Sequence, residues 1–335
     1  MNSMIMKRRI FIHHLSALTI GSLLPLSGCR NNQPVSFGIC TDVHKDLIPD
    51  ANERMQQFIE TMNRVLPDFI IQLGDFCFPE VENEVFRDLF NQFGRPHYHV
   101  LGNHDMDTCD KRTVLDYWGV KKAYYSFDQG PFHFVVLDPN FFFDNNKPVA
   151  YKHGNYYAHP ETRAAIPSEQ LTWLKNDLGA SNKPTIIFSH QGLELEDGVY
   201  NQKEVRHLLE TSGKVIACFA GHHHTDLHTE INGIHYFQMN SMSYQWVGEK
   251  YKCESRFKGT FNSLYPSLKY TAPYQDSLFA LVKVYPDGRL IIDGRQSVFM
   301  PPTPHELGAL SHLYGIPLTA SIGNRELKFS SHRKK

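Results

Sequence analysis

Short apolar runs alternate with amphipathic helical segments between Val35 and Leu101, and this order limits the possible folds more strongly than any other feature of the chain. The runs VSFGIC, DFIIQL and HYHVL have the length and composition of buried strands. The segments 52–66 and ENEVFRDLFNQF (82–93) repeat apolar residues at helical spacing. Their predicted buried faces are Met55, Phe58, Ile59, Met62, Val65 and Leu66 in the first, and Val85, Phe86, Leu89, Phe90 and Phe93 in the second. Strand and helix in this order predict a parallel β-α-β core.

The middle and the end of the chain favour more antiparallel structure. Three hairpins are predicted, at Gln129-Gly130-Pro131, at Asn232-Gly233 and at Asp287-Gly288. IPSEQLTWLKNDL reads as a helix with Ser168 as its possible cap. PTIIFS and KVIACFA read as two further buried strands, and LTASIGNRELKF in the extended, polar tail as a final strand. This mixture predicts an α/β domain of two packed sheets with helices outside.

The N-terminus is typical of an export signal. MKRRIF supplies positive charge, LSALTIGSLLPL is a short apolar stretch, and LSGC (26–29) resembles the bacterial lipoprotein box. RRIFI also resembles a twin-arginine signal, and an uncleaved anchor helix is the alternative. We therefore expect a signal peptide over 1–28, a tether over 29–34, the main globular domain over 35–300 and a C-terminal extension packed on it over 301–335. The resemblance implies an exported, membrane-anchored lipoprotein, periplasmic or on the cell surface, that is tethered through lipidated Cys29.

Composition excludes several classes of protein. The chain has 34 Lys and Arg against 35 Asp and Glu, so no specific nucleic-acid binding is expected. Hydrophobic residues make up 41%, which is enough for a packed core. The cysteines after Cys29 are odd in number and lack CxxC spacing, so we predict neither a disulfide framework nor a cysteine metal site.

Residues of metal-ligand type follow five of the predicted strands. They are Asp42 and His44; Asp75; Asn103, His104 and Asp105; His190; and His222, His223 and His224. Ligands of open α/β sheets bind beyond the carboxyl ends of the strands, so these side chains can converge. The histidine-rich stretch FAGHHHTDLH (219–228) is ambiguous alone, but its place after a strand makes it part of this pattern.

The ordered set Asp-x-His, Gly-Asp, Gly-Asn-His-Asp, His and Gly-His-x-His resembles the calcineurin-like metallophosphoesterases. The resemblance implies a four-layer αββα sandwich, in which two mixed β-sheets are flanked by helices, with two metal ions between the sheets. It implies that Asp42, His44 and His224 hold the first metal, and that Asn103, His190 and His222 hold the second. Asp75 would bridge the two ions, and His223 would point away. Imidazole and oxygen ligands suit Fe, Mn, Zn or Co, and leave the identity open.

The resemblance also implies a reaction. A hydroxide that bridges the metals would attack phosphorus, and His104 would act as general acid on the leaving oxygen. The stretch GDFCFPE places Phe78 and Pro79 where the phosphoprotein phosphatases have Asp and Arg, which argues against that branch. The residue that orients His104 is left open between Asp105 and Asp107. After His190 the chain has Gln191-Gly192 where many relatives have proline, and we expect His190 to remain a ligand.

The substrate is less defined. Aromatic residues in the segment 240–274 either stack on a base or sugar ring at the mouth of the site or belong to the core. They are Tyr244, Trp246, Tyr251, Phe257, Phe261, Tyr265, Tyr270 and Tyr274. The polar segment 145–167 is predicted to be a lid or binding loop, with His153 and His159 on its surface. We hypothesise a monomeric phosphoesterase acting on a phosphodiester or a small organic phosphate, whether a small molecule or a lipid- or nucleotide-type ester.

Two alternatives remain. One is a non-catalytic surface lipoprotein that binds metal or glycan through the aromatic segment. The other is a metallo-β-lactamase-like hydrolase, which would use His222, His224 and Asp226, although Leu227 stands at its fourth ligand position.

Overall fold

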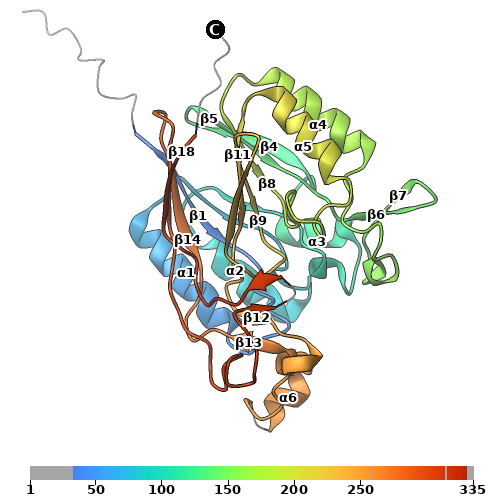
Figure 1. Ribbon diagram of the computed structural model, residues 1–335, viewed down its shortest axis with the longest axis vertical. Coiled ribbons are helices and arrows are strands. Elements are labelled where there is room, and N and C mark those ends of the chain that lie inside the picture. The colour runs from blue at the N-terminus through green and yellow to red at the C-terminus, as the bar shows by residue number, and fades with distance from the viewer. Residues whose placement is uncertain (1–32, 258, 314, 330–335) are drawn as a thin grey trace, which may run out of the picture.

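The computed structural model describes residues 33–257, 259–313 and 315–329 (Figure 1). The predicted signal peptide, Cys29 and most of the tether lie outside the described residues. Within the described part of the chain, no helix is both long and apolar enough to cross a membrane. Cys40, Cys77, Cys109, Cys218 and Cys253 are free thiols.

The first sheet has six strands in the order β18-β15-β14-β1-β2-β3. Its parallel half consists of β1 (Val35–Cys40), β2 (Phe69–Gln72) and β3 (His97–His99), joined by helical crossovers as predicted. Its antiparallel half consists of β14 (Ala280–Val284), β15 (Arg289–Asp293) and β18 (Arg325–Lys328). The segment beyond residue 300 therefore supplies the outermost strand of this sheet.

The second sheet has the order β10-β11-β9-β8-β5-β4. Its strands are β4 (Tyr125–Gln129), β5 (Phe132–Val136), β8 (Thr185–Phe188), β9 (Val215–Ala220), β10 (Leu227–Ile231) and β11 (Ile234–Gln238). The predicted antiparallel character is wrong for the centre of this sheet, where β5, β8, β9 and β11 are all parallel. Helices serve as the crossovers from β5 to β8 and from β8 to β9, and only the edge strands β4 and β10 are antiparallel, in the predicted hairpins.

Helices cover both outer faces, which confirms the four-layer αββα sandwich (Figure 1). The helices α1 (Ala51–Val65), α2 (Glu84–Asn91) and α3 (Lys111–Trp118) pack on the first sheet, and α4 (Ser168–Ala180) and α5 (Gln202–Ser212) pack on the second. Side chains alternate across each strand: Ile186 and Phe188 enter the core between the sheets, whereas Ile187 packs under α4 and α5.

Three predicted core positions are exposed. Val65 and Leu66 are 48% and 50% exposed because α1 ends there, and Leu66 takes a left-handed conformation as the C-cap. Val85 is 65% exposed, so α2 buries only the face that carries Phe86 and Phe90. Ser168 does not cap α4: it is the first helical residue, and Pro167 holds the N-cap position.

Smaller elements lie outside the two main sheets. The hairpins are β6 (Phe141–Asp144) with β7 (Lys147–Ala150), β12 (Tyr244–Trp246) with β13 (Thr271–Pro273), and β16 (His312–Leu313) with β17 (Ile316–Pro317). The short helices are α6 (Thr260–Leu264), η1 (Val81–Asn83), η2 (His104–Met106), η3 (Asn155–Ala158), η4 (Glu249–Tyr251) and η5 (Leu268–Tyr270). In Figure 1 the β6–β7 hairpin projects from the body, and α6 extends below β12 and β13.

An ion-pair cluster joins β4, β5 and α4. The ring of His133 lies 2.7 Å from Asp128 and 2.8 Å from Asp177, and its hydrogen bond to Asp177 is the main cause of a raised pKa. A raised pKa in the folded state stabilises the fold below the ordinary value, and this stabilisation is lost as the pH rises through the raised pKa.

We expect His133→Gln to lower the free energy of unfolding by about 1.5 kcal/mol at about pH 6, because it removes the charged partner of two carboxylates. The deficit should be smaller at about pH 9, because the wild-type ring loses its charge as the pH rises through its pKa. Urea unfolding of both proteins at the two pH values measures the difference. An equal deficit at both would show that the charge of His133 does not change between the two pH values, and would contradict this account.

Candidate metal centre

The carboxyl ends of five strands bring the predicted ligand residues to one edge of the sandwich. Asp42 and His44 follow β1, Asp75 follows β2, Asn103 follows β3, His190 follows β8, and His222 and His224 follow β9. Contacts between the ligand residues and their neighbours join the two sheets here. Nδ1 of His190 lies 2.8 Å from the backbone oxygen of Leu73, and the backbone N–H of His222 donates to Oδ2 of Asp42 across 3.0 Å. The edge where both sheets end is therefore held together by the candidate site itself.

The side chains form two groups that match the predicted pair of sites. Asp42, His44 and His224 make the first group, and Asp75, His190 and His222 make the second. Within each group the potential ligand atoms lie within 4.8 Å of one another. Oδ1 of Asp42 lies 3.2 Å from Nε2 of His224 and 3.8 Å from Nε2 of His44. Carboxylate and imidazole donors at this spacing suit a transition-metal ion.

Asp75 lies between the two groups. Its Oδ2 is 3.1 Å from Nε2 of His190 in the second group and 3.6 Å from Nε2 of His44 in the first. One carboxylate oxygen therefore faces histidines of both groups, as a bridging ligand must. The other oxygen, Oδ1, accepts the backbone N–H of His104 at 2.8 Å, which fixes the carboxylate.

The histidine rings are oriented as metal ligands commonly are. Nδ1 of His190 lies 2.8 Å from the oxygen of Leu73, and Nδ1 of His224 lies 2.9 Å from the oxygen of Tyr244. A carbonyl only accepts, so each Nδ1 carries the proton and Nε2 is free to coordinate. Nε2 of His190 is buried and has no hydrogen bond of good geometry within the described residues. A buried nitrogen without such a partner fits the role of a metal ligand.

The backbone around the site is strained. Asp42, His44, Asp75, His222 and His224 all have positive φ, between 48° and 70°. Non-glycine residues seldom adopt this conformation, and it concentrates at functional sites where the surrounding structure enforces it. Five such residues in one site indicate that the placement of the metal-ligating side chains, rather than local backbone preference, determines the conformation of these loops.

Glycines next to the ligands give the carboxylates room. A Cβ on Gly102 would collide with the backbone nitrogen and the carboxylate of Asp75, and one on Gly221 would collide with Thr41 and with the carboxylate of Asp42. The glycines of the Gly-Asn-His-Asp and Gly-His-x-His motifs are therefore required by close packing against the carboxylates.

Gly102→Ala should lower the free energy of unfolding by about 1–3 kcal/mol through overpacking, and should weaken metal binding because it displaces Asp75. Gly94→Ala is the matched control, since a Cβ at Gly94 meets no atom within 4 Å. Thermal unfolding and metal analysis of both variants measure the two effects. Normal metal content in the Gly102 variant would contradict this account.

The electrostatics of the site favour added cations. Burial opposes charge on Asp42 and Asp75, but neighbouring histidines hold the pKa of both carboxyls below the usual range. Burial also opposes charge on His190, yet Asp75 and Asp42 outweigh it and raise its pKa to about 9. Burial lowers the pKa of His44 to about 3. Two charged carboxylates at the centre draw positive charge toward themselves, which dications would satisfy.

Asp107 orients His104. Its Oδ2 lies 2.7 Å from Nδ1 of His104, and its Oδ1 accepts the hydroxyl of Tyr156 at 2.6 Å. Of the two candidates, Asp105 has a different role: its carboxylate accepts the backbone N–H groups of Phe76 and Gly102, each at 2.7 Å. Asp105 therefore holds the loops after β2 and β3 together, and Asp107 holds the ring.

Asn103 is held from one side by Gln191. Nε2 of Gln191 donates to the side-chain oxygens of Asn103 at 3.3 Å and of Asn140 at 3.1 Å. Asn103 borders a small cavity of about 110 Å³ together with His104 and His222. Gln191, which replaces the expected proline, leaves His190 in the second group.

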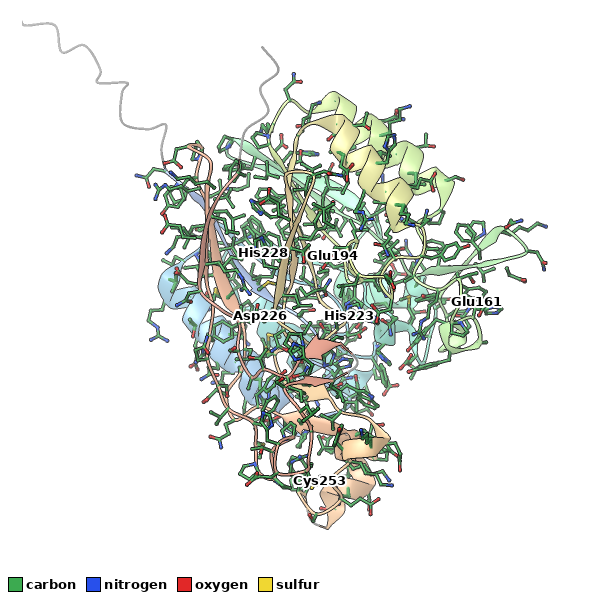
Figure 2. The ribbon with its side chains drawn as sticks, in the orientation of Figure 1. Glu161, Glu194, His223, Asp226, His228 and Cys253 are labelled. Atoms are coloured by element: carbon green, nitrogen blue, oxygen red, sulfur yellow. The ribbon has the colours of Figure 1, made fainter. Side chains whose placement is uncertain are left out.

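The histidine-rich stretch divides between several environments. His222 and His224 belong to the ligand groups, whereas Nε2 of His223 lies 3.0 Å from Asp197. His228, labelled in Figure 2, lies on β10. Its ring lies 3.1 Å from that of His235. Asp226, also labelled in Figure 2, accepts a hydrogen bond from Arg325 at 2.7 Å and belongs to neither ligand group. The ligand pattern of a metallo-β-lactamase-like hydrolase is therefore not formed.

A cavity of about 600 Å³ opens over both ligand groups. Among its walls are the aromatic side chains of Phe78, Tyr157, Tyr244, Trp246 and Tyr265. The aromatic segment thus divides between the two alternatives: three of its members line the cavity, whereas Tyr274 is buried in the core between the sheets.

The segment 145–167, which is predicted to be a lid or binding loop, supplies Tyr157 and Arg163 to the cavity walls. Its two histidines do not join the ligand groups. His153 is exposed, with Nδ1 2.9 Å from the oxygen of Thr108, and His159 stacks on Phe142 with ring centroids 4.0 Å apart. No sequence pattern pointed to Tyr156 or Arg163 as residues of the site. Asp107 could be found from the sequence, because it lies one helical turn after His104.

Comparisons with known proteins agree with this geometry. The chain is 25% identical over 263 residues to a manganese-dependent ADP-ribose/CDP-alcohol diphosphatase of Oryza sativa subsp. japonica, covering 60% of this chain and 81% of the rice protein. The protein of the same name from Arabidopsis thaliana is 24% identical over 279 residues, covering 62% of this chain and 86% of that protein. A dimetal phosphatase from Danio rerio shares the fold, with a TM-score of 0.58 at 16% identity, over 80% of this chain and 99% of that one.

The family match includes the strand ends that carry the ligand residues. The sequence model of the calcineurin-like phosphoesterases matches residues 35–226, more than half of the 335-residue chain. This segment contains both ligand groups. Members of the family hydrolyse phosphoric ester bonds and use two metal ions, as predicted from the motifs. The chain is therefore a metallophosphoesterase and belongs to the calcineurin-like phosphoesterase family.

Proposed function

We propose that the protein hydrolyses a phosphodiester or diphosphate bond in a small, nucleotide-type phosphate ester. The observation that carries this proposal is the position of Asp75, whose Oδ2 faces His190 of one ligand group and His44 of the other. Two cations held around one carboxylate are suited to bind and polarise a phosphoryl group.

The proposed ligands are those expected from the motifs. One ion would be held by Asp42, His44 and His224. The other would be held by Asn103, His190 and His222, and Asp75 would contact both ions. When bound, the ions supply Lewis-acid chemistry, which neutralises phosphoryl oxygens and lowers the pKa of water. The ligand types suit several transition metals, and the names of two related diphosphatases specify manganese, so Mn is the first ion to test.

His104 is proposed as the general acid. Its Nδ1 contacts Asp107, so a proton for the leaving oxygen would come from Nε2 of a ring that lines the cavity. The charges of Asp75 and Asp107 outweigh the effect of burial and raise the pKa of His104, which supports a ring that carries a proton to the reaction. Tyr156 completes this arrangement by donating to Asp107.

The aromatic wall supports a substrate that carries a ring. Trp246 is 44% exposed and lines the cavity with Tyr265, and stacking on a base or sugar would bury its surface. Two relatives are named for ADP-ribose and CDP-alcohols, which contain such rings joined to a diphosphate. Phe78 and Pro79 stand in place of the Asp and Arg of phosphoprotein phosphatases, so a protein substrate is disfavoured.

The direct test uses the purified domain loaded with Mn. We expect hydrolysis of ADP-ribose, of a CDP-alcohol or of bis(p-nitrophenyl) phosphate, and its loss after chelation and recovery after Mn is returned. A protein shown to contain two metal ions that hydrolyses none of these esters would overturn the proposal.

We also propose that the protein acts as a monomer outside the cytoplasmic membrane, tethered through lipidated Cys29. The support is the LSGC sequence after a short apolar stretch. Cys29→Ala should move the protein from the membrane fraction to the soluble fraction or leave its precursor unprocessed, and sedimentation of the domain should give one chain. Unchanged fractionation would contradict the tether.

A further inference from the structure

Arg163 is the one lysine or arginine in the described walls of the two cavities over the ligand groups. It borders the larger cavity and also the smaller one, which Asn103 and His222 line. The guanidinium of Arg163 therefore stands beside the second ligand group.

The carboxylates in the same walls already have partners. Asp46 accepts from the backbone of Phe78 at 2.7 Å and from Asn83 at 2.6 Å. Asp107 contacts His104, and Asp197 lies 3.0 Å from the ring of His223. The guanidinium of Arg163, in contrast, makes no hydrogen bond or ion pair with any residue that the structure describes. A guanidinium in a cavity wall without an anion beside it is prepared to bind one from solution.

The backbone that carries Arg163 is held in place. Residue 163 pairs with Phe142 in an isolated β-bridge. On one side Thr162 donates its hydroxyl to the oxygen of Phe143 at 2.9 Å. On the other side, Ala164 has a φ of +58°, a strained conformation for alanine, and the hydroxyl of Tyr151 accepts its N–H at 2.6 Å. Strain that the surrounding contacts enforce next to Arg163 points to a binding role for this part of the cavity wall.

We propose that Arg163 binds a second phosphoryl group, next to the one that is attacked, and so selects diphosphate compounds over esters with a single phosphate. This inference rests on the proposed function and assigns part of its specificity to one residue. Guanidinium binds phosphate oxygens through two parallel hydrogen bonds, which a single-phosphate ester lying on the metal ions would not use. Arg163 also supplies the site with an arginine, which the Gly-Asp motif of this chain lacks.

The test compares two substrates and two variants. Arg163→Gln should lower kcat/KM for ADP-ribose by about 10- to 100-fold, mainly by raising KM, and should change bis(p-nitrophenyl) phosphate by less than about threefold. Arg163→Lys should have a kcat/KM for ADP-ribose between those of the wild type and Arg163→Gln, because an ammonium group keeps the charge but not the planar geometry of the guanidinium. Lys147→Gln is the matched control: it removes one positive charge from the exposed tip of the β6–β7 hairpin of the same segment.

A binding measurement separates this inference from the proposed function. Inorganic pyrophosphate should inhibit the wild type more strongly than inorganic phosphate, and Arg163→Gln should remove that preference while metal content and melting temperature stay unchanged. Suppose that the wild type cleaves bis(p-nitrophenyl) phosphate. If Arg163→Gln then lowers kcat/KM equally for both substrates, or lowers it for neither, the second-phosphate role is wrong. If the wild type cleaves no ester, the proposed function itself fails.

Discussion

Asp75→Asn is expected to lower kcat/KM by more than about 100-fold, since partners one step further from a metal already cost 10- to 100-fold when they are changed. The amide keeps the size of the side chain and one oxygen, but it removes the negative charge that faces both ligand groups. Two cations held close together repel each other, so at least one should bind more weakly. Metal analysis together with Mn titration of activity measures both effects.

A control separates the role of Asp75 from a general loss of charge. Asp116→Asn removes the same charge from a half-exposed carboxylate on α3, which pairs only with Arg112 within the described part of the chain, and should leave activity and metal content unchanged. If Asp75→Asn still binds two ions and retains full activity, Asp75 does not bridge the groups, and the account of the site is wrong.

His104→Ala is expected to lower kcat by about 100- to 10,000-fold, the usual contribution of a general acid, while both metal ions remain bound. His104 belongs to neither ligand group, so its loss should not empty either of them. The matched control is His153→Ala, which changes an exposed histidine whose ring contacts the backbone oxygen of Thr108 and no ligand residue. Single-turnover kinetics and metal analysis measure the two properties.

The leaving group gives this prediction a sharper form. A weakly basic leaving group such as p-nitrophenolate needs little help from an acid, so the defect of His104→Ala should be smaller on bis(p-nitrophenyl) phosphate than on an alkyl ester. An equal defect on both would indicate that His104 binds the phosphoryl group instead. Loss of metal together with activity would make His104 a ligand, and full activity would leave it no catalytic part.

Local sequence determined the elements and the chemical types at their ends. Phe58 and Met62, or Phe86 and Phe90, share a helical face because the helix repeats every 3.6 residues, and their burial follows from that repeat. The order of the chain likewise placed Asp42, Asp75 and His190 after strands, and parallel strands end at one edge of their sheet.

Only the tertiary structure decided how segments far apart in the chain meet. The central strands of the second sheet are parallel because α4 and α5 return the chain across its outer face, which the hairpin signals at its edges did not show. Tyr156 reaches His104 across 52 residues of sequence, and Arg163 reaches the cavity through a β-bridge to Phe142. Helical and strand periodicity act over a few residues, whereas these contacts depend on the packing of the whole domain, so no local pattern encodes them.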